Sequence, residues 1–165
     1  TKVDGFDLDK SPFSYMNPAM AGRTLAMTTT NGTLAITKSR AAHRVLVGSF
    51  LNCGTVTAYL RNQPFDVLVV CAGWKGKYNL EDTLFAGSVV CKLKNDFAIE
   101  DDSALAALMI YDAAKFNMLK FIAHSSHVRR LARLSLTRDI EFCLRENMYD
   151  TLPVLENGML VQGLK

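Results

Sequence analysis

The sequence lacks the features that mark several common classes of protein. Its four cysteines are widely and irregularly spaced and form no Cys-x-x-Cys pair, which argues against a disulfide framework or a zinc site. The longest apolar run, near residues 67–72, is far too short to cross a bilayer. No Gly-x-Gly-x-x-Gly turn is present, so the usual dinucleotide-binding fingerprint is missing. We therefore expect a cytoplasmic protein with reduced thiols and no membrane partner.

A strong excess of charge is also missing. Nineteen Lys and Arg residues against sixteen Asp and Glu give a net charge of +3, which would not repel a small anion but does not indicate nucleic acid. The arginines within residues 129–138 have no interleaved aromatic residues, so we expect no nucleic-acid partner. The chain opens on Thr1-Lys2 with neither an initiator methionine nor a signal peptide. We expect it to lie within a longer protein.

The composition that is present suits one folded domain. The chain has 165 residues, of which 49% are hydrophobic and 21% charged, enough to build a sizeable core. Residues 1–22 contain Pro12 and Pro18, which interrupt regular structure, and we predict that they are a lead or linker from a missing N-terminal lobe. Residues 23–165 are predicted to form a single α/β domain.

Strand and helix patterns alternate through the first part of that domain. Strands are predicted at residues 23–27, 44–48 and 66–71, each followed by a polar turn and a helix. Such alternation favours right-handed crossovers and a three-layer α/β/α fold with a mainly parallel sheet, a Rossmann-like variant. After residue 95 the pattern is mostly helical. Asn157-Gly158 between two apolar runs predicts a C-terminal hairpin.

The first polar turn is the leading candidate for a functional site. It consists of Thr28, Thr29, Thr30, Asn31, Gly32 and Thr33, between the first predicted strand and its helix. A helix start presents unpaired N–H groups that favour an anion, and the threonine hydroxyls add further donors. The spacing predicts a phosphate- or sulfonate-binding turn. A capped loop of the kind found in any α/β protein explains the same residues.

Two later turns supply further candidates. The carboxyl ends of parallel strands meet at one edge of a sheet, so Asn52 and Gly73 are predicted to line the same cleft as the threonine turn. Glu81 and Asp82 open the helix after the strongest strand and are candidate catalytic carboxylates, with Glu81 as a Mg²⁺ ligand. Each has a structural alternative: helix capping for Asn52, loop flexibility for Gly73, and charge complementation of a helix start for the two acids.

Several short strings, taken together, resemble the 2-phosphosulfolactate phosphatase family. They are Gly-Phe-Asp (5–7), Ser-Pro (11–12), Thr-Thr-Thr-Asn-Gly-Thr (28–33), Gly-Ser-Phe-Leu-Asn (48–52), Cys-Ala-Gly (71–73) and Glu-Asp-Thr-Leu-Phe-Ala-Gly (81–87). The match is specific from residue 5 to about 90 and looser to the end of the chain. It corresponds to the C-terminal two-thirds of the family, whose N-terminal lobe is absent. Lys10 stands where the family usually has an asparagine.

The resemblance implies a function. Members of this family resemble Mg²⁺-dependent phosphatases that convert 2-phosphosulfolactate to sulfolactate and phosphate, a step towards coenzyme M. We expect association with the missing N-terminal lobe or a homo-oligomer. The nucleophile stays open between metal-bound water, Cys71 and a residue of the missing lobe. The alternative function is a non-catalytic anion-binding or assembly domain that holds only half of an active site.

Overall fold

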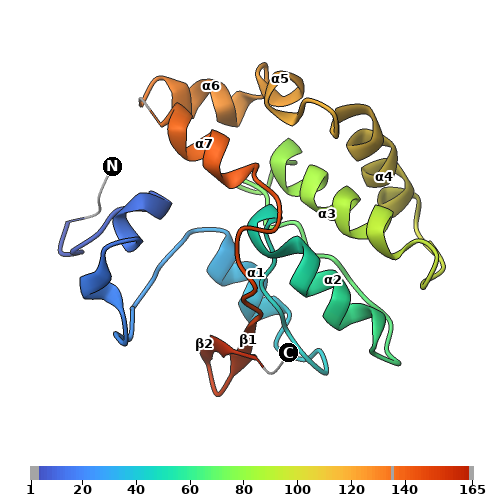
Figure 1. The fold of residues 1–165 in the computed structure, drawn as a ribbon, viewed down its shortest axis with the longest axis horizontal. Coiled ribbons are helices and arrows are strands. Elements are labelled where there is room, and N and C mark those ends of the chain that lie inside the picture. The colour runs from blue at the N-terminus through green and yellow to red at the C-terminus, as the bar shows by residue number, and fades with distance from the viewer. Residues whose placement is uncertain (1–3, 135, 164–165) are drawn as a thin grey trace.

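The computed structural model describes residues 4–134 and 136–163, which form seven α-helices and a two-stranded sheet (Figure 1). Three short 3-10 helices, η1, η2 and η3, accompany them. The elements in chain order are η1 (Pro12–Tyr15), η2 (Pro18–Met20), α1 (Gly32–Lys38), η3 (Phe50–Asn52), α2 (Cys53–Arg61), α3 (Leu80–Leu93), α4 (Asp102–Ala114), α5 (Met118–Ile122), α6 (Ser126–Ala132), α7 (Thr137–Cys143), β1 (Pro153–Glu156) and β2 (Met159–Gln162).

Helix α3 is at the centre of the core, between α2 and α4 (Figure 1). Asn79 caps it, because its Oδ1 accepts a hydrogen bond from the Glu81 N–H at 3.0 Å. Gly87 allows α4 to approach closely, since a Cβ atom there would lie 2.0 Å from the carbonyl oxygen of Ala107. Buried apolar side chains on α3 and α4 supply a large part of the core, including Leu84, Val89, Leu93, Tyr111 and Ala114.

The predicted C-terminal hairpin is confirmed. β1 and β2 pair antiparallel, with Pro153 opposite Gln162 and Glu156 opposite Met159. Asn157 and Gly158 both have positive φ, 50° and 82°, as a two-residue type I′ connection requires. The sequence predicts this element well because its turn chemistry is local.

The predicted mixture of helices and strands is confirmed, but the described residues do not form the expected parallel sheet. Residues 44–48 instead run antiparallel to β1, where the Val47 N–H donates to the Pro153 oxygen and the Leu155 N–H to the Val45 oxygen, each at 3.0 Å. Residues 23–27 and 66–71 belong to no strand ladder. A strand needs a neighbour for its backbone hydrogen bonds, and a sequence pattern does not guarantee that neighbour.

Part of the predicted lead, residues 1–22, packs on the helical region. The Phe13 ring lies 5.2 Å from the Phe142 ring, centroid to centroid, and the Arg138 guanidinium lies 4.2 Å from the centre of the Phe13 ring. The boundary between residues 22 and 23 stays a prediction. In the described part of the chain even the longest helix, α3 with 14 residues, is not one that could span a bilayer.

Candidate functional site

The threonine turn directly precedes α1 and is open to solvent. Thr28, Thr30 and Thr33 are exposed, and Thr29 is half-buried. The Thr33 N–H donates to Thr29 Oγ1 at 3.1 Å, and the Thr33 hydroxyl donates to the Thr29 carbonyl oxygen. The expectation of free amides at this helix start is therefore wrong for Thr33, because the turn's own side chain takes that donor. Of the exposed threonine hydroxyls in the turn, those of Thr28 and Thr30 donate to no other group among the described residues.

A short loop, residues 72–77, joins the threonine turn to the start of α3. The Lys75 N–H donates to Asn31 Oδ1 at 3.2 Å, and the Gly73 N–H donates to Asp82 Oδ2 at 2.7 Å. The structure thus brings together three of the predicted residues: Asn31 of the turn, Gly73 and Asp82. These two contacts join residues 44 and 9 positions apart in the sequence, so a local sequence pattern does not predict them.

The conformation of this loop requires glycine at position 73. Gly73 has φ = +67°, and a Cβ atom there would lie 2.6 Å from the Lys77 carbonyl oxygen. Beyond it, Trp74 and Lys77 exchange two backbone hydrogen bonds of 3.0 Å. The Lys75 ammonium lies 5.0 Å from the centre of the Trp74 ring, and the Arg130 guanidinium lies 5.2 Å from it. Two cations therefore lie beside the loop, where they favour an anionic ligand.

Glu81 holds the one buried side-chain oxygen without a hydrogen-bond partner among the described residues. Its Oε1 accepts a 2.7 Å hydrogen bond from the Ser125 hydroxyl, whereas Oε2 is buried and unpartnered. The ion pairs formed within residues 4–134 and 136–163 do not include Glu81. An unsatisfied buried carboxylate oxygen is costly, so it points to a missing ligand such as a cation.

The donors around Glu81 suit a Mg²⁺ ion that is only partly held by protein. No group of three or more His, Cys, Asp or Glu side chains is arranged as a metal site in the described part of the chain. Mg²⁺ commonly binds one or two carboxylates and completes its shell with water and substrate phosphate. Glu81 fits this ion because its Oε2 has no hydrogen-bond partner among the described residues. Asp82 lies beside it on α3, with one carboxylate oxygen already held by Gly73.

Sequence reasoning missed Ser125, which caps α6. Its hydroxyl donates to Glu81 and accepts from the Val128 N–H at 3.1 Å, so both its donor and an acceptor position are used. The available clue was a serine before a short helix, which indicates an N-cap but does not reveal a contact 44 residues away.

Asn52 lies within the fold, with its amide fully engaged. Its Oδ1 accepts from the Ser49 N–H at 2.8 Å, and its Nδ2 donates to the carbonyl oxygens of Val47 and Thr151 at 3.3 and 3.0 Å. These bonds fix the start of α2 and the approach to β1. Its proposed place in the ligand cleft stays a prediction, without a contact to the threonine turn in the part of the chain described here.

Cys71 ends the extended segment before the loop. Partial burial and the nearby negative charge of Asp82 both raise the pKa of the Cys71 thiol. The thiol is therefore mostly protonated at neutral pH, which does not suit an activated nucleophile.

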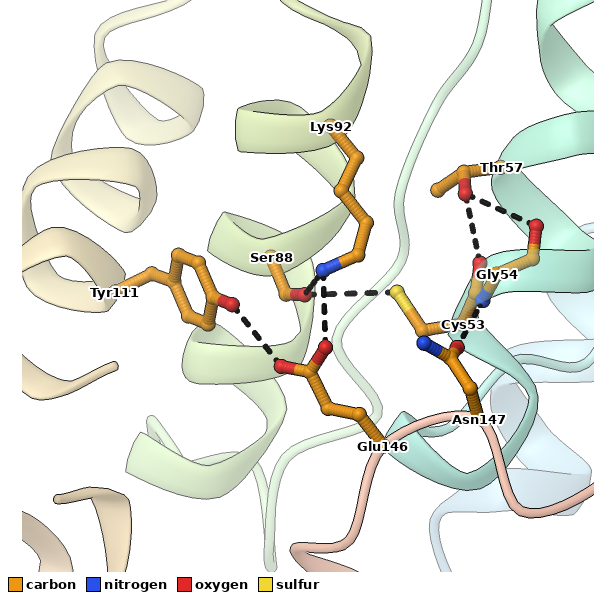
Figure 2. Close-up of polar contacts among 8 residues, drawn as sticks. All are labelled: Cys53, Gly54, Thr57, Ser88, Lys92, Tyr111, Glu146 and Asn147. Carbon is orange, nitrogen blue, oxygen red and sulfur yellow. Dashed lines mark hydrogen bonds and ion pairs between the residues drawn. The ribbon is translucent and has the colours of Figure 1, made fainter. Parts of the chain in front are cut away.

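A second polar cluster lies inside the helical region, and the sequence analysis did not identify it (Figure 2). Glu146 accepts from the Lys92 ammonium at 3.1 Å and from the Tyr111 hydroxyl at 3.0 Å. Lys92 also donates to Ser88 Oγ at 3.2 Å, and Ser88 contacts the fully buried Cys53 sulfur at 3.5 Å. The cluster ties the segment after α7 to α2, α3 and α4, so we assign it a structural role.

Burial raises the pKa of the Cys53 thiol and of the Tyr111 phenol. For Lys92, burial lowers the pKa, but the hydrogen bond and charge of Glu146 outweigh it and raise the pKa overall. All three groups therefore hold their protons more tightly in the folded state than in the unfolded state. Stability from such groups is present below the unfolded pKa values and is lost as the pH rises through the folded ones.

We therefore expect the free energy of unfolding to fall progressively above about pH 9, the unfolded pKa region of a thiol. Urea unfolding at a series of pH values from 7.5 to 10.5 measures this. Tyr111→Phe should make the fall shallower because it removes one titrating group, whereas Tyr78→Phe, at an exposed position, should leave the slope unchanged. A stability that is flat up to pH 10.5 would contradict the assignment.

Comparison with known proteins adds an independent observation. The family model for 2-phosphosulpholactate phosphatase matches residues 1–158. Proteins named probable 2-phosphosulfolactate phosphatase are similar to this chain. The one from Thermotoga petrophila is 40% identical over 161 residues, 97% of this chain and 69% of the relative. The one from Caldanaerobacter subterraneus is 38% identical over 161 residues, covering 96% and 66%. The chain spans about two thirds of the length of these relatives.

Proposed function

Because this chain belongs to the 2-phosphosulfolactate phosphatase family, we propose that it carries the metal- and anion-binding part of a phosphomonoester hydrolase. The proposed reaction is the Mg²⁺-dependent release of phosphate from 2-phosphosulfolactate to give sulfolactate, within coenzyme M synthesis in the cytoplasm. Family membership favours this over a non-catalytic assembly domain. The observation that carries the proposal is the buried, unpartnered Oε2 of Glu81.

Glu81 is the proposed Mg²⁺ ligand, through Oε2. When bound there, Mg²⁺ would neutralise the charge that develops on the transferring phosphoryl group. Ser125 holds Oε1 of the same carboxylate, which leaves Oε2 as the oxygen that can bind a cation. Asp82 holds the loop 72–77 through Gly73 and thereby fixes this loop against the first turn of α3, where Glu81 lies.

The negative oxygens of the substrate would bind at the threonine turn and the adjoining loop. The exposed hydroxyls of Thr28 and Thr30 are free to turn towards a phosphate or sulfonate. Lys75 and Arg130, placed about the Trp74 ring, add positive charge beside the turn. A substrate that carries acidic groups besides its phosphate suits a site that has both a cation ligand and nearby cationic side chains.

Among the nucleophiles left open by the sequence, Cys71 is disfavoured by its raised pKa. Water or a residue outside this chain would then attack the phosphorus atom. The residues described here bind, orient and neutralise the phosphoryl group, which is the larger part of catalysis in phosphoryl transfer.

The direct test is phosphate release from 2-phosphosulfolactate with 5 mM Mg²⁺ and after removal of metal by EDTA. We expect release to depend on Mg²⁺ and to exceed that from the phosphomonoester of an uncharged alcohol, because the site favours a further acidic group besides the phosphate. Metal-independent release, or equal turnover of the ester of the uncharged alcohol, would contradict the proposal.

Ser125→Ala should weaken Mg²⁺ binding by about 10- to 100-fold, because removal of a group that orients a metal ligand has effects of that size. Titration with Mn²⁺, followed by its electron paramagnetic resonance, measures this without an activity assay. Loss of the α6 cap costs about 1 kcal/mol of stability as well. Ser125→Thr keeps the hydroxyl and should restore most of the affinity; equal Mn²⁺ binding by all three proteins would remove Ser125 from the site.

A further inference from the structure

We propose that residues 66–71 are an unpaired β-strand that forms its ladder with a polypeptide corresponding to the third of its relatives' length for which this chain has no counterpart. This inference rests on the exposure and hydrogen bonding of the segment, and it does not depend on the proposed activity.

The first observation is the alternation of burial along the segment. Val67 and Val69 are half-buried, and Val69 packs on the core cluster of Cys53, Val89 and Leu93. The residues that alternate with them, Leu68 and Val70, are 86% and 51% exposed. A period of two is the pattern of a strand with one face on a helical layer and the other face open. Two large aliphatic side chains on an open face indicate that this face is covered in the functional protein.

The second observation is the backbone. Within the described residues, no hydrogen bond joins the main chain of residues 66–71 to another segment. Unpaired N–H and C=O groups beside exposed aliphatic side chains form a ready template for another strand. Addition of a strand at such an edge is a common mode of recognition, in which backbone bonds give affinity and alternate side chains give specificity.

A second segment has the same character. Residues 23–27 are exposed throughout, with Leu25 and Met27 45% and 60% exposed, and they too belong to no ladder. The turns that follow the two segments touch each other through the Asn31–Lys75 hydrogen bond. Both segments therefore end at the candidate site, so pairing of either one would fix the loops that form it.

The lengths of the relatives indicate which polypeptide pairs with residues 66–71. Alignment with the relatives covers 96–97% of this chain but only 66–69% of theirs. Their additional third is present in proteins that share nearly all of this sequence region, including the extended segments. We therefore propose this additional third, and not a second copy of this chain, as the partner of residues 66–71.

The test compares hydrogen exchange in two proteins: the 165-residue chain, and a chimera in which the unmatched residues of the Thermotoga petrophila relative are joined to it in that relative's order. We expect the amides of residues 66–71 to exchange at least about 100-fold more slowly in the chimera, while those of α3 stay protected in both. Size-exclusion chromatography with light scattering should show that the 165-residue chain and the chimera are both monomers.

Matched variants separate pairing from general effects. Leu68→Glu combined with Val70→Glu should abolish the extra protection in the chimera and leave the stability of the 165-residue chain unchanged. Phe116→Glu, at a position 91% exposed just after α4, should leave the protection intact. Equal exchange of residues 66–71 in both proteins, with α3 protected, would overturn the proposal. A homodimer of the 165-residue chain that protects these residues would also overturn it.

Discussion

Glu81→Gln is expected to lower kcat/KM for phosphate release by about 10³-fold, because a metal ion bound to phosphate stabilises the transition state by several kcal/mol. The substitution keeps the shape of the side chain and its hydrogen bond to Ser125, but it removes the negative charge beside the buried Oε2 position. The measurement is Mg²⁺-dependent phosphate release by the 165-residue chain and by the chimera. Unchanged turnover would remove Glu81 from the mechanism.

The same variant gives a readout that needs no turnover. Mg²⁺ at 100 times its dissociation constant should stabilise the unsubstituted protein by about 2.7 kcal/mol, because the ion binds the folded state only. Glu81→Gln should lose this increment and, without metal, should unfold at no lower a urea concentration, since the unpaired buried charge is gone. Glu141→Gln, at an exposed position on α7, is the control and should keep the full Mg²⁺ response. If Mg²⁺ stabilised Glu81→Gln and Glu141→Gln equally, the ion would bind at a site other than Glu81.

Gly87→Ala is expected to lower the free energy of unfolding by about 3 kcal/mol, at the upper end of the usual effect of overpacking. The new methyl group would lie 2.0 Å from the Ala107 carbonyl oxygen and 2.7 Å from Tyr111 Cβ. One of these contacts is with backbone, so α4 itself must move away from α3. The gain in helix propensity, about 1 kcal/mol, offsets only part of this cost.

Urea unfolding followed by circular dichroism measures that loss. Ala106→Gly, at an exposed position on α4, is the matched control and should cost only about 1 kcal/mol through helix propensity. Because the movement of α4 disturbs Tyr111, Gly87→Ala should also weaken the polar cluster at Glu146. Equal stability of Gly87→Ala and the unsubstituted protein would contradict the close approach of α3 and α4.

Local chemistry was enough to predict the elements whose partners lie close by in the sequence. Asn157-Gly158 predicted the hairpin, and the structure has both residues at positive φ. The helix that Glu81 and Asp82 were predicted to open is α3, where Asn79 is the cap and both acids occupy the first turn. These features depend on backbone conformation over a few residues, so the sequence determines them.

Pairing over long distances could not be predicted in the same way. The patterns at residues 23–27 and 66–71 indicate strands, yet these segments form no ladder with any described part of the chain. Residues 44–48 run antiparallel to β1. A period-two pattern specifies which face is apolar but not which segment lies alongside. For residues 66–71, we propose that the neighbour is outside this chain.

By itself, the sequence determined the family, the hairpin, the long helix α3 and the candidate residues of the turn and of Glu81 and Asp82. Only the tertiary structure decided that Ser125 takes one oxygen of Glu81 and leaves the other buried and unpaired, and that Thr29 takes the Thr33 amide. The physical reason is that a hydrogen-bonding group has several partners within reach, and packing of distant segments selects among them.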